Sequence, residues 1–330
     1  MGGKLFNLPR MPRADYLVRE RAMRAYLDAA HPRYRIPRFY GDKPDFGDMD
    51  IIVPTRPDWA AVRGKIAADL GITRTRAVGN VFSTVYDGLQ TDFFAVPERF
   101  VDSTYDYMSF NDLGNLLGRI ARRFNLKWGE EGLSYVYRRA GSGHYVADLP
   151  VTQDFARVCR FLRLDHAAWV AGFPTLTSLF EWVVTCPHFS VAPYLDDPGG
   201  PVGLRGDRPT IARFAEFLRD RRIDARPAFA EKTGYVGTIA AAFPEAGLEE
   251  QIARERVKEQ RAAAIAEKFS GKLVMRLRPE LAGPALGEFI VAFKRSIPDF
   301  EAFLLEAPAD EIERRIRSFA AGSPPEPPPT

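Results

Sequence analysis

The chain has 330 residues, 46% hydrophobic and 27% charged, which is the composition of a globular protein with room for more than one domain. Its formal net charge is only +3, so charge balance alone does not identify a nucleic-acid-binding protein. Two cysteines, Cys159 and Cys186, exclude a disulfide framework and a cysteine-rich zinc site. No run approaches the roughly 20 apolar residues of a membrane span, so we expect a cytoplasmic protein with no membrane partner.

The N-terminal part is basic and partly helical. Apolar residues recur at helical spacing from Arg13 to Ala30, which predicts a helix over that range. Lysines and arginines outnumber acids between Met1 and Lys43. A basic arm can follow a phosphate backbone, and a solvated amphipathic helix shows the same pattern. Both interpretations stay open.

Three apolar runs then predict strands of one sheet. Residues 49–53 are rich in β-branched side chains, and a helix is predicted over 59–70. Residues 78–86 and 89–96 form two further strand-like runs. The dipeptide Asp87-Gly88 separates them, and it favours a tight hairpin because both turn positions require positive φ.

The remainder of the chain is predicted to be mostly helical. A helix over 111–124 precedes a second hairpin, formed by 133–137 and 145–149 around a plain turn at Gly141-Ser142-Gly143. Further helices are predicted over 153–162, 175–185, 211–221, 248–269, 284–296 and 310–320. Residues 322–330 are rich in proline, and we expect them to be a disordered tail.

Acidic residues interrupt two of the predicted strands. Asp48 and Asp50 are two residues apart, so their side chains share one face of the strand, where like charges repel. Asp92 lies within the apolar run 89–96. If the two strands are neighbours, the three carboxylates converge, and a hard divalent cation such as Mg²⁺ would remove the repulsion. Solvated loop acids are the alternative.

These residues resemble the motifs of the polymerase beta superfamily of nucleotidyltransferases. Gly47-Asp48-Met49-Asp50, followed by Ile51-Ile52-Val53, is similar to the first motif, and Thr91-Asp92-Phe93-Phe94 to the second. Residues 115–133 and 152–164 are similar to helix-and-turn segments of family X DNA polymerases. The resemblance covers residues 35–164.

The resemblance implies catalytic and metal-binding roles for Asp48, Asp50 and Asp92, with two Mg²⁺ ions as cofactors and Mn²⁺ as a substitute. The superfamily's Gly-Ser pair, which holds the triphosphate, is altered, because Asp42 stands in the serine position. Position along the chain suggests Arg38, Gly41 and Lys43 as nucleotide-binding residues. The resemblance adds Gly47, which belongs to the first motif, and Tyr107, which falls near the place where those polymerases have an aromatic beside the incoming sugar. For Tyr107, a buried aromatic is the more common outcome.

The predicted fold class is α+β. It consists of a nucleotidyltransferase palm with a mixed sheet and flanking helices (1–104, including the basic helix), a small thumb-like α/β segment (105–165) and an all-α C-terminal region (166–321). The expected function is Mg²⁺-dependent transfer of a nucleotide from a nucleoside triphosphate to a 3′-hydroxyl of DNA or RNA, with release of pyrophosphate. Two alternatives stay open: a protein or small-molecule acceptor, or a catalytically silent nucleic-acid-binding module.

Overall fold

The computed structural model describes residues 5–31, 33–195 and 209–319. The chain combines helices with mixed and antiparallel sheets, which confirms the predicted α+β class. Its contacts divide it into two compact units, Met1–Leu248 and Glu249–Thr330. This division falls inside the predicted helical region, and the finer boundaries after residues 104 and 165 stay predictions.

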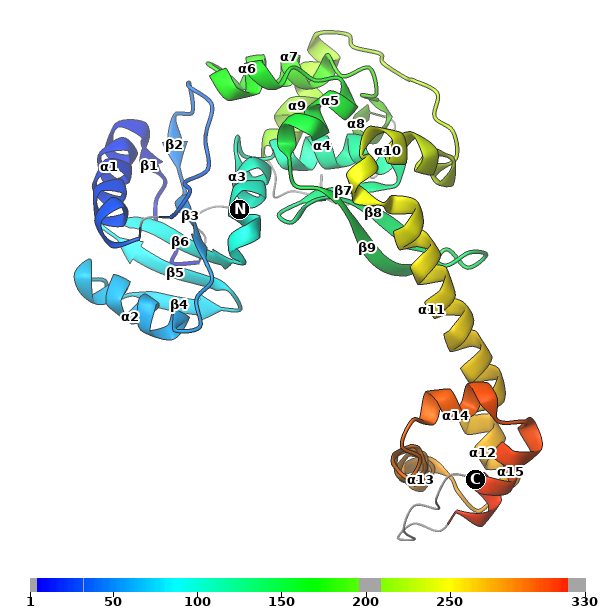
Figure 1. The fold of residues 1–330 in the computed structure, drawn as a ribbon. Coiled ribbons are helices and arrows are strands. Elements are labelled where there is room, and N and C mark those ends of the chain that lie inside the picture. The colour runs from blue at the N-terminus through cyan, green and yellow to red at the C-terminus, as the bar shows by residue number, and fades with distance from the viewer. Residues whose placement is uncertain (1–4, 32, 196–208, 320–330) are drawn as a thin grey trace. The chain divides into compact units, whose positions relative to one another are not determined.

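The first unit contains a four-stranded mixed sheet in the order β3-β6-β5-β4 (Figure 1). Its strands are β3 (Asp48–Pro54), β4 (Thr75–Val78), β5 (Val81–Tyr86) and β6 (Leu89–Val96). β3 pairs with β6 in parallel, whereas β5 pairs with β6 and β4 with β5 in antiparallel fashion. The Asp87-Gly88 hairpin is confirmed, since φ is 45° at Asp87 and 80° at Gly88.

One face of this sheet packs against two helices, α1 (Arg13–Ala30) and α2 (Trp59–Asp69). Buried side chains from these helices and from three strands form its core: Tyr16, Met23, Leu27, Met49, Ile51, Val53, Ile66, Phe82, Phe93 and Ala95. Alternate residues of a strand point to opposite faces, so Asp48, Asp50 and Asp92 belong to the other face.

That other face packs against α3 (Val101–Met108), which follows the short 3₁₀ helix η1 (Glu98–Phe100). Ile52, Val96 and Val101 form a small buried cluster there. The three aspartates therefore share a sheet face with α3 rather than with α1 and α2.

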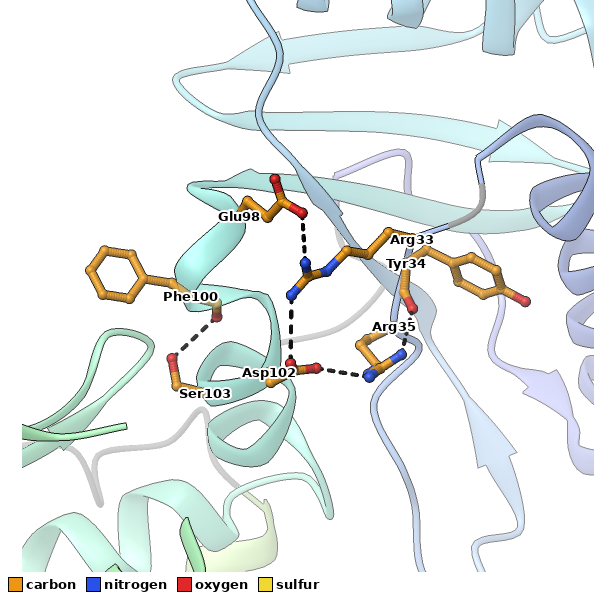
Figure 2. A network of polar contacts seen from close by, with 7 residues as sticks. All are labelled: Arg33, Tyr34, Arg35, Glu98, Phe100, Asp102 and Ser103. Atoms are coloured by element: carbon orange, nitrogen blue, oxygen red, sulfur yellow. Dashed lines mark hydrogen bonds and ion pairs between the residues drawn. The ribbon is translucent and has the colours of Figure 1, made fainter. Parts of the chain in front are cut away.

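Ion pairs tie the start of α3 to the segment that precedes β2 (Asp45–Phe46). Figure 2 shows Arg33 between Glu98 and Asp102, at 2.6 and 3.6 Å, and Arg35 bound to the same Asp102 at 2.9 Å. Arg35 also forms an isolated antiparallel bridge with Ile52 of β3. These exposed ion pairs link the start of α3 to the chain that runs beside β3.

A three-stranded antiparallel sheet, β7-β8-β9, follows in the same unit (Figure 1). Its strands are β7 (Leu126–Gly129), β8 (Gly132–Arg138) and β9 (Tyr145–Thr152). The other elements of this unit are β1 (Met11–Pro12), α4 (Leu113–Ala121), η2 (Arg122–Phe124), α5 (Phe155–Leu162), α6 (His166–Ala171), α7 (Leu176–Val184), α8 (Ala192–Leu195), α9 (Pro209–Asp220), η3 (Lys232–Tyr235), α10 (Val236–Ala242) and η4 (Pro244–Ala246).

The second unit is helical in its described residues. Its elements are α11 (Leu248–Lys268), which starts at the division, α12 (Gly271–Leu277), α13 (Gly283–Arg295), α14 (Phe300–Glu306) and α15 (Ala309–Ser318). They enclose their own core of buried apolar side chains: Phe269, Val274, Leu277, Phe289, Phe293, Ile297, Leu304, Ala307, Ile312 and Ile316.

Two features of the predicted secondary structure need correction. The predicted strand over 78–86 is wrong as a single element, because Gly79 has a φ of 58° and a turn separates β4 from β5. The second hairpin, β8–β9, is confirmed. It belongs to a three-stranded sheet, because β7, which was not predicted, pairs with β8. Among the described residues, no helix has the length and apolarity to cross a membrane. The predicted tail, 322–330, lies outside the described residues.

Candidate metal centre

Strand register brings the acidic residues together. In the parallel pair β3–β6, Asp50 lies directly opposite Asp92, and Asp48 lies opposite Gln90. One carboxylate oxygen from each of Asp48, Asp50 and Asp92 lies within 4.8 Å of the others. The predicted convergence of these three residues is confirmed.

The ligand atoms that this cluster offers are all carboxylate oxygens. Hard divalent cations prefer such ligands, whereas zinc sites usually contain nitrogen or sulfur. Asp92 is 8% exposed, and its Oδ1 is buried with no hydrogen-bond partner among the described residues. A buried carboxylate oxygen without a partner is costly, and a bound cation would satisfy it.

Burial and mutual repulsion disfavour ionisation of the acidic pair. Burial raises the pKa of Asp50 well above its ordinary value, and the charges of Asp48 and Asp92 act in the same direction. Burial, followed by the charge of Asp92, also raises the pKa of Asp48. A divalent cation would reverse this effect, because it favours the ionised carboxylates and releases their protons on binding.

Gln90 is a polar member of the site that sequence reasoning missed. It is 5% exposed, and its Nε2 donates a hydrogen bond of 2.8 Å to Oδ2 of Asp92. The available signal was its position: it lies two residues before Asp92 on a strand, so the two side chains share a face. A buried glutamine inside an apolar strand is itself uncommon.

Lys43 is the predicted nucleotide-binding residue whose charge lies beside the cluster. Burial lowers its pKa, while the negative charges of Asp48 and Asp50 act against that decrease. Its Nζ lies 4.3 Å from the centre of the Phe46 ring and donates a hydrogen bond of 3.3 Å to Oδ1 of Asn111. The ammonium group of Lys43 thus lies near the carboxylates.

Gly41 and Arg38 contact a distant segment of the chain. The Gly41 N–H donates to the Phe173 carbonyl at 2.8 Å, and a Cβ at Gly41 would lie 2.5 Å from the Pro174 carbonyl oxygen. The Arg38 guanidinium donates to the carbonyls of Trp169 and Val170, both at 2.9 Å. These contacts are structural, and nucleotide binding by either residue stays a prediction.

The altered Gly-Ser position has an internal partner as well. Oδ1 of Asp42 accepts a hydrogen bond of 3.1 Å from the N–H of Leu176, the first residue of α7. A carboxylate is favourable at this place, because a helix N-terminus carries partial positive charge. The helix end is therefore already occupied by an anionic group of the same chain.

Tyr107 is half-buried and Gly47 is buried. The Tyr107 ring lies edge-on to Trp128 at 6.4 Å, and a Cβ at Gly114 would lie 2.8 Å from it. Gly47 is buried between the last residue of β2 and the first residue of β3. Their proposed contacts with nucleotide stay predictions.

Ion pairs occupy several residues of the predicted basic arm. Arg10 pairs with Asp45 at 2.6 Å, Arg19 with Asp87 at 3.0 Å, and Arg33 with Glu98 at 2.6 Å. These pairs reduce the positive charge that this segment offers to a phosphate backbone.

Comparison with known proteins adds no relative. No protein-family model matches the chain, and no curated protein sequence matches it. The resemblance to the polymerase beta superfamily therefore stays a prediction that rests on the motifs, whereas the α+β fold and the cluster of three aspartates are features of the structure itself.

Proposed function

We propose that this chain is a Mg²⁺-dependent nucleotidyltransferase with a palm-like catalytic sheet. In this proposal, Asp48, Asp50 and Asp92 hold two Mg²⁺ ions, and the enzyme transfers a nucleotide from a nucleoside triphosphate to a 3′-hydroxyl of DNA or RNA. The observation that carries the proposal is the convergence of three carboxylates from two neighbouring strands to within 4.8 Å.

The donor set fits the proposed ions. All three ligands are carboxylates, Asp50 is disfavoured as an anion by burial and by its neighbours, and Asp92 has a buried oxygen without a partner. Mg²⁺ combines a few carboxylate ligands with water and substrate phosphate oxygens. When bound, such ions neutralise phosphate charge and lower the pKa of an attacking hydroxyl.

The residues of the chain then have separate tasks. Asp48 and Asp50 would hold the cations that position the triphosphate. Asp92 would hold the cation beside the acceptor hydroxyl, which lowers the pKa of that hydroxyl, and would take up its proton. The 3′-oxygen forms a bond to the α-phosphorus while the bond between that phosphorus and the α,β-bridging oxygen breaks, and pyrophosphate leaves. This reaction depends mainly on alignment and charge neutralisation, so a small polar cluster suffices.

Lys43 is the residue that we assign to the triphosphate. Its ammonium group lies near Asp48 and Asp50, and its contact with Asn111 leaves two of its three donor hydrogens for phosphate oxygens. Gly41 and Arg38 would fix the backbone that precedes Lys43 through their contacts with residues 169–174.

One observation favours the second candidate, a catalytically silent nucleic-acid-binding module. Asp42 occupies the N-terminus of α7, and the Gly41 N–H is bonded to Phe173, so these groups already have partners within the chain. A phosphate would have to displace them or bind elsewhere.

The proposal is tested by supplying the purified chain with labelled nucleoside triphosphates and Mg²⁺ or Mn²⁺. Primed DNA, single-stranded DNA and tRNA serve as acceptors. We expect incorporation on at least one of them and a loss of about 100-fold or more in Asp92→Asn, since a metal ligand contributes several kcal/mol to transition-state stabilisation.

The matched control is Asp102→Asn, which also removes one carboxylate from the first unit but lies in the surface network of Figure 2. It should retain activity. Unchanged incorporation by Asp92→Asn would refute the mechanism. Nucleic-acid binding without turnover, and without metal-dependent binding of nucleoside triphosphate, would favour the silent module instead.

A further inference from the structure

The amide of Gln90 bridges two partners that lie far apart in the sequence. Its Nε2 donates to Oδ2 of Asp92 at 2.8 Å, and its Oε1 accepts a hydrogen bond of 3.2 Å from the backbone N–H of Leu5. The Leu5 N–H is only a donor, so it selects the oxygen end of the amide. The nitrogen end is then directed at the carboxylate.

Leu5 belongs to a segment that we call the N-terminal strap, residues 5–12. The Phe6 carbonyl accepts a hydrogen bond of 3.2 Å from the Arg74 guanidinium, whose carbon lies 5.4 Å from the centre of the Phe6 ring. Arg10 pairs with Asp45 at 2.6 Å. At its end, Met11 and Pro12 form strand β1, which pairs with β2. The strap is therefore fastened at several points along the sheet.

The bond from Gln90 makes the two carboxylate oxygens of Asp92 unequal. Oδ2 is bonded to Gln90, whereas Oδ1 is buried and has no hydrogen-bond partner among the described residues. A side chain with one oxygen fixed has lost most of its torsional freedom before any ligand arrives, which lowers the entropic cost of binding.

We propose that Gln90 is a positioning residue, set by the N-terminal strap, that holds Asp92 so that Oδ1 is left to bind the cation. This inference rests on the proposed metal site, but it extends that site to a segment at the start of the chain. The strap orients the metal ligand Asp92 through two successive hydrogen bonds, from Leu5 to Gln90 and from Gln90 to Asp92.

The proposal is tested by measuring Mn²⁺ binding to the full chain, with the free ion detected by electron paramagnetic resonance. This measurement needs no substrate. Gln90→Met keeps the length of the side chain and removes the donor. We expect its Mn²⁺ dissociation constant to rise about ten-fold or more, the usual effect of losing a group that orients a metal ligand. Leu5→Pro removes the backbone donor, together with the leucine side chain that Leu5→Ala controls for, and should shift the constant in the same direction.

Two comparisons separate positioning from a general structural effect. Leu5→Ala retains the N–H and should bind Mn²⁺ like the unaltered chain. The double variant Gln90→Met/Leu5→Pro should lose no more affinity than Gln90→Met alone, because both changes break one chain of hydrogen bonds. A merely structural role would lower the melting temperature without changing Mn²⁺ affinity. Should Gln90→Met fail to fold, Leu5→Pro carries the test.

The outcomes distinguish this inference from the proposed function. One outcome overturns the positioning role alone: Asp92→Asn weakens Mn²⁺ binding, whereas Gln90→Met and Leu5→Pro leave the dissociation constant within two-fold of that of the unaltered chain. Absence of Mn²⁺ binding in the unaltered chain overturns both proposals. Mn²⁺ binding that depends on Gln90, in a protein that transfers no nucleotide, supports the positioning role and removes only the enzymatic proposal.

Discussion

The acidic cluster should destabilise the protein when no metal is bound, and Asp50→Asn should relieve that cost. The oxygens of Asp50, Asp48 and Asp92 lie within 4.8 Å of one another. At that separation, two unit charges repel by about 3.5 kcal/mol at an effective dielectric constant of about 20. Partial protonation relieves much of this repulsion, so we expect Asp50→Asn to raise the free energy of unfolding by about 1–3 kcal/mol at pH 8.

The pH dependence has a definite sign. Burial and the two neighbouring charges raise the pKa of Asp50 in the folded protein, so the folded state holds its proton more tightly than the unfolded state. The stability of the metal-free protein therefore falls as the pH rises through the folded-state pKa. The advantage of Asp50→Asn is full at high pH and should vanish near pH 4, about where an unfolded aspartate titrates.

Differential scanning calorimetry in EDTA and in Mg²⁺ measures both effects. For a unit of this size, each kcal/mol corresponds to a change of about 2–4 °C in melting temperature. Mg²⁺ should stabilise the unaltered chain more than Asp50→Asn, because only the former has all three carboxylates. Asp102→Asn, at the ion-paired surface of α3, should change stability by less than about 1 kcal/mol. The reasoning is refuted if Asp50→Asn is less stable than the unaltered chain in EDTA at pH 8.

Two further predictions concern the first unit. Burial, with help from two neighbouring aspartates, raises the pKa of Asp106 to about 7. Ionisation of Asp106 therefore costs stability as the pH rises through 7. In urea unfolding, the free energy of unfolding of Asp106→Asn should match that of the unaltered chain at pH 4 and exceed it by about 1–2 kcal/mol at pH 8. A larger advantage at pH 4 would contradict this. Gly41→Ala should lower the free energy of unfolding by about 1–3 kcal/mol, because its Cβ would lie 2.5 Å from the carbonyl oxygen of Pro174. Gly64→Ala, on the exposed face of α2 with nothing within 4 Å of its Cβ, should raise it by about 0.5–1 kcal/mol. Equal unfolding free energies for the two glycine variants would refute the packing argument.

The acidic cluster was predictable because its geometry follows from local rules. The two-residue period of a strand places Asp48 and Asp50 on one face, and a two-residue turn at Asp87-Gly88 fixes where the next strand begins. That β3 and β6 are neighbours, with Asp92 on the same sheet face as the pair, had to be assumed. The helix over Arg13–Ala30 was equally accessible, because its apolar spacing and its boundaries are local features.

The surroundings of the site were not predictable, because they depend on contacts between distant segments. Arg38 binds carbonyls of residues 169 and 170, and Gly41 packs against Pro174, although no local pattern links these segments. The bond from Leu5 to Gln90 spans 85 residues. Position in the sequence made Arg38 and Gly41 candidates for nucleotide binding, whereas the structure shows that internal groups already contact both.

Strand β6 pairs with β3 on one side and with β5 on the other, so a redesign of the chain must preserve its register. A one-residue slip of β6 would carry Asp92 to the face packed against α1 and α2 and bring Phe93 to the acidic one, since side chains alternate along a strand. An epitope or spacer grafted at Asp87-Gly88 would shift that alignment, because the turn sets where the strand starts. The bend at Gly79-Asn80 joins β4 to β5, but Asn80 also accepts a hydrogen bond of 2.9 Å from the Ala95 N–H of β6 and donates one of 3.2 Å to the Ala95 carbonyl. A graft there would leave the carboxylates opposite one another only if it keeps Asn80 in place.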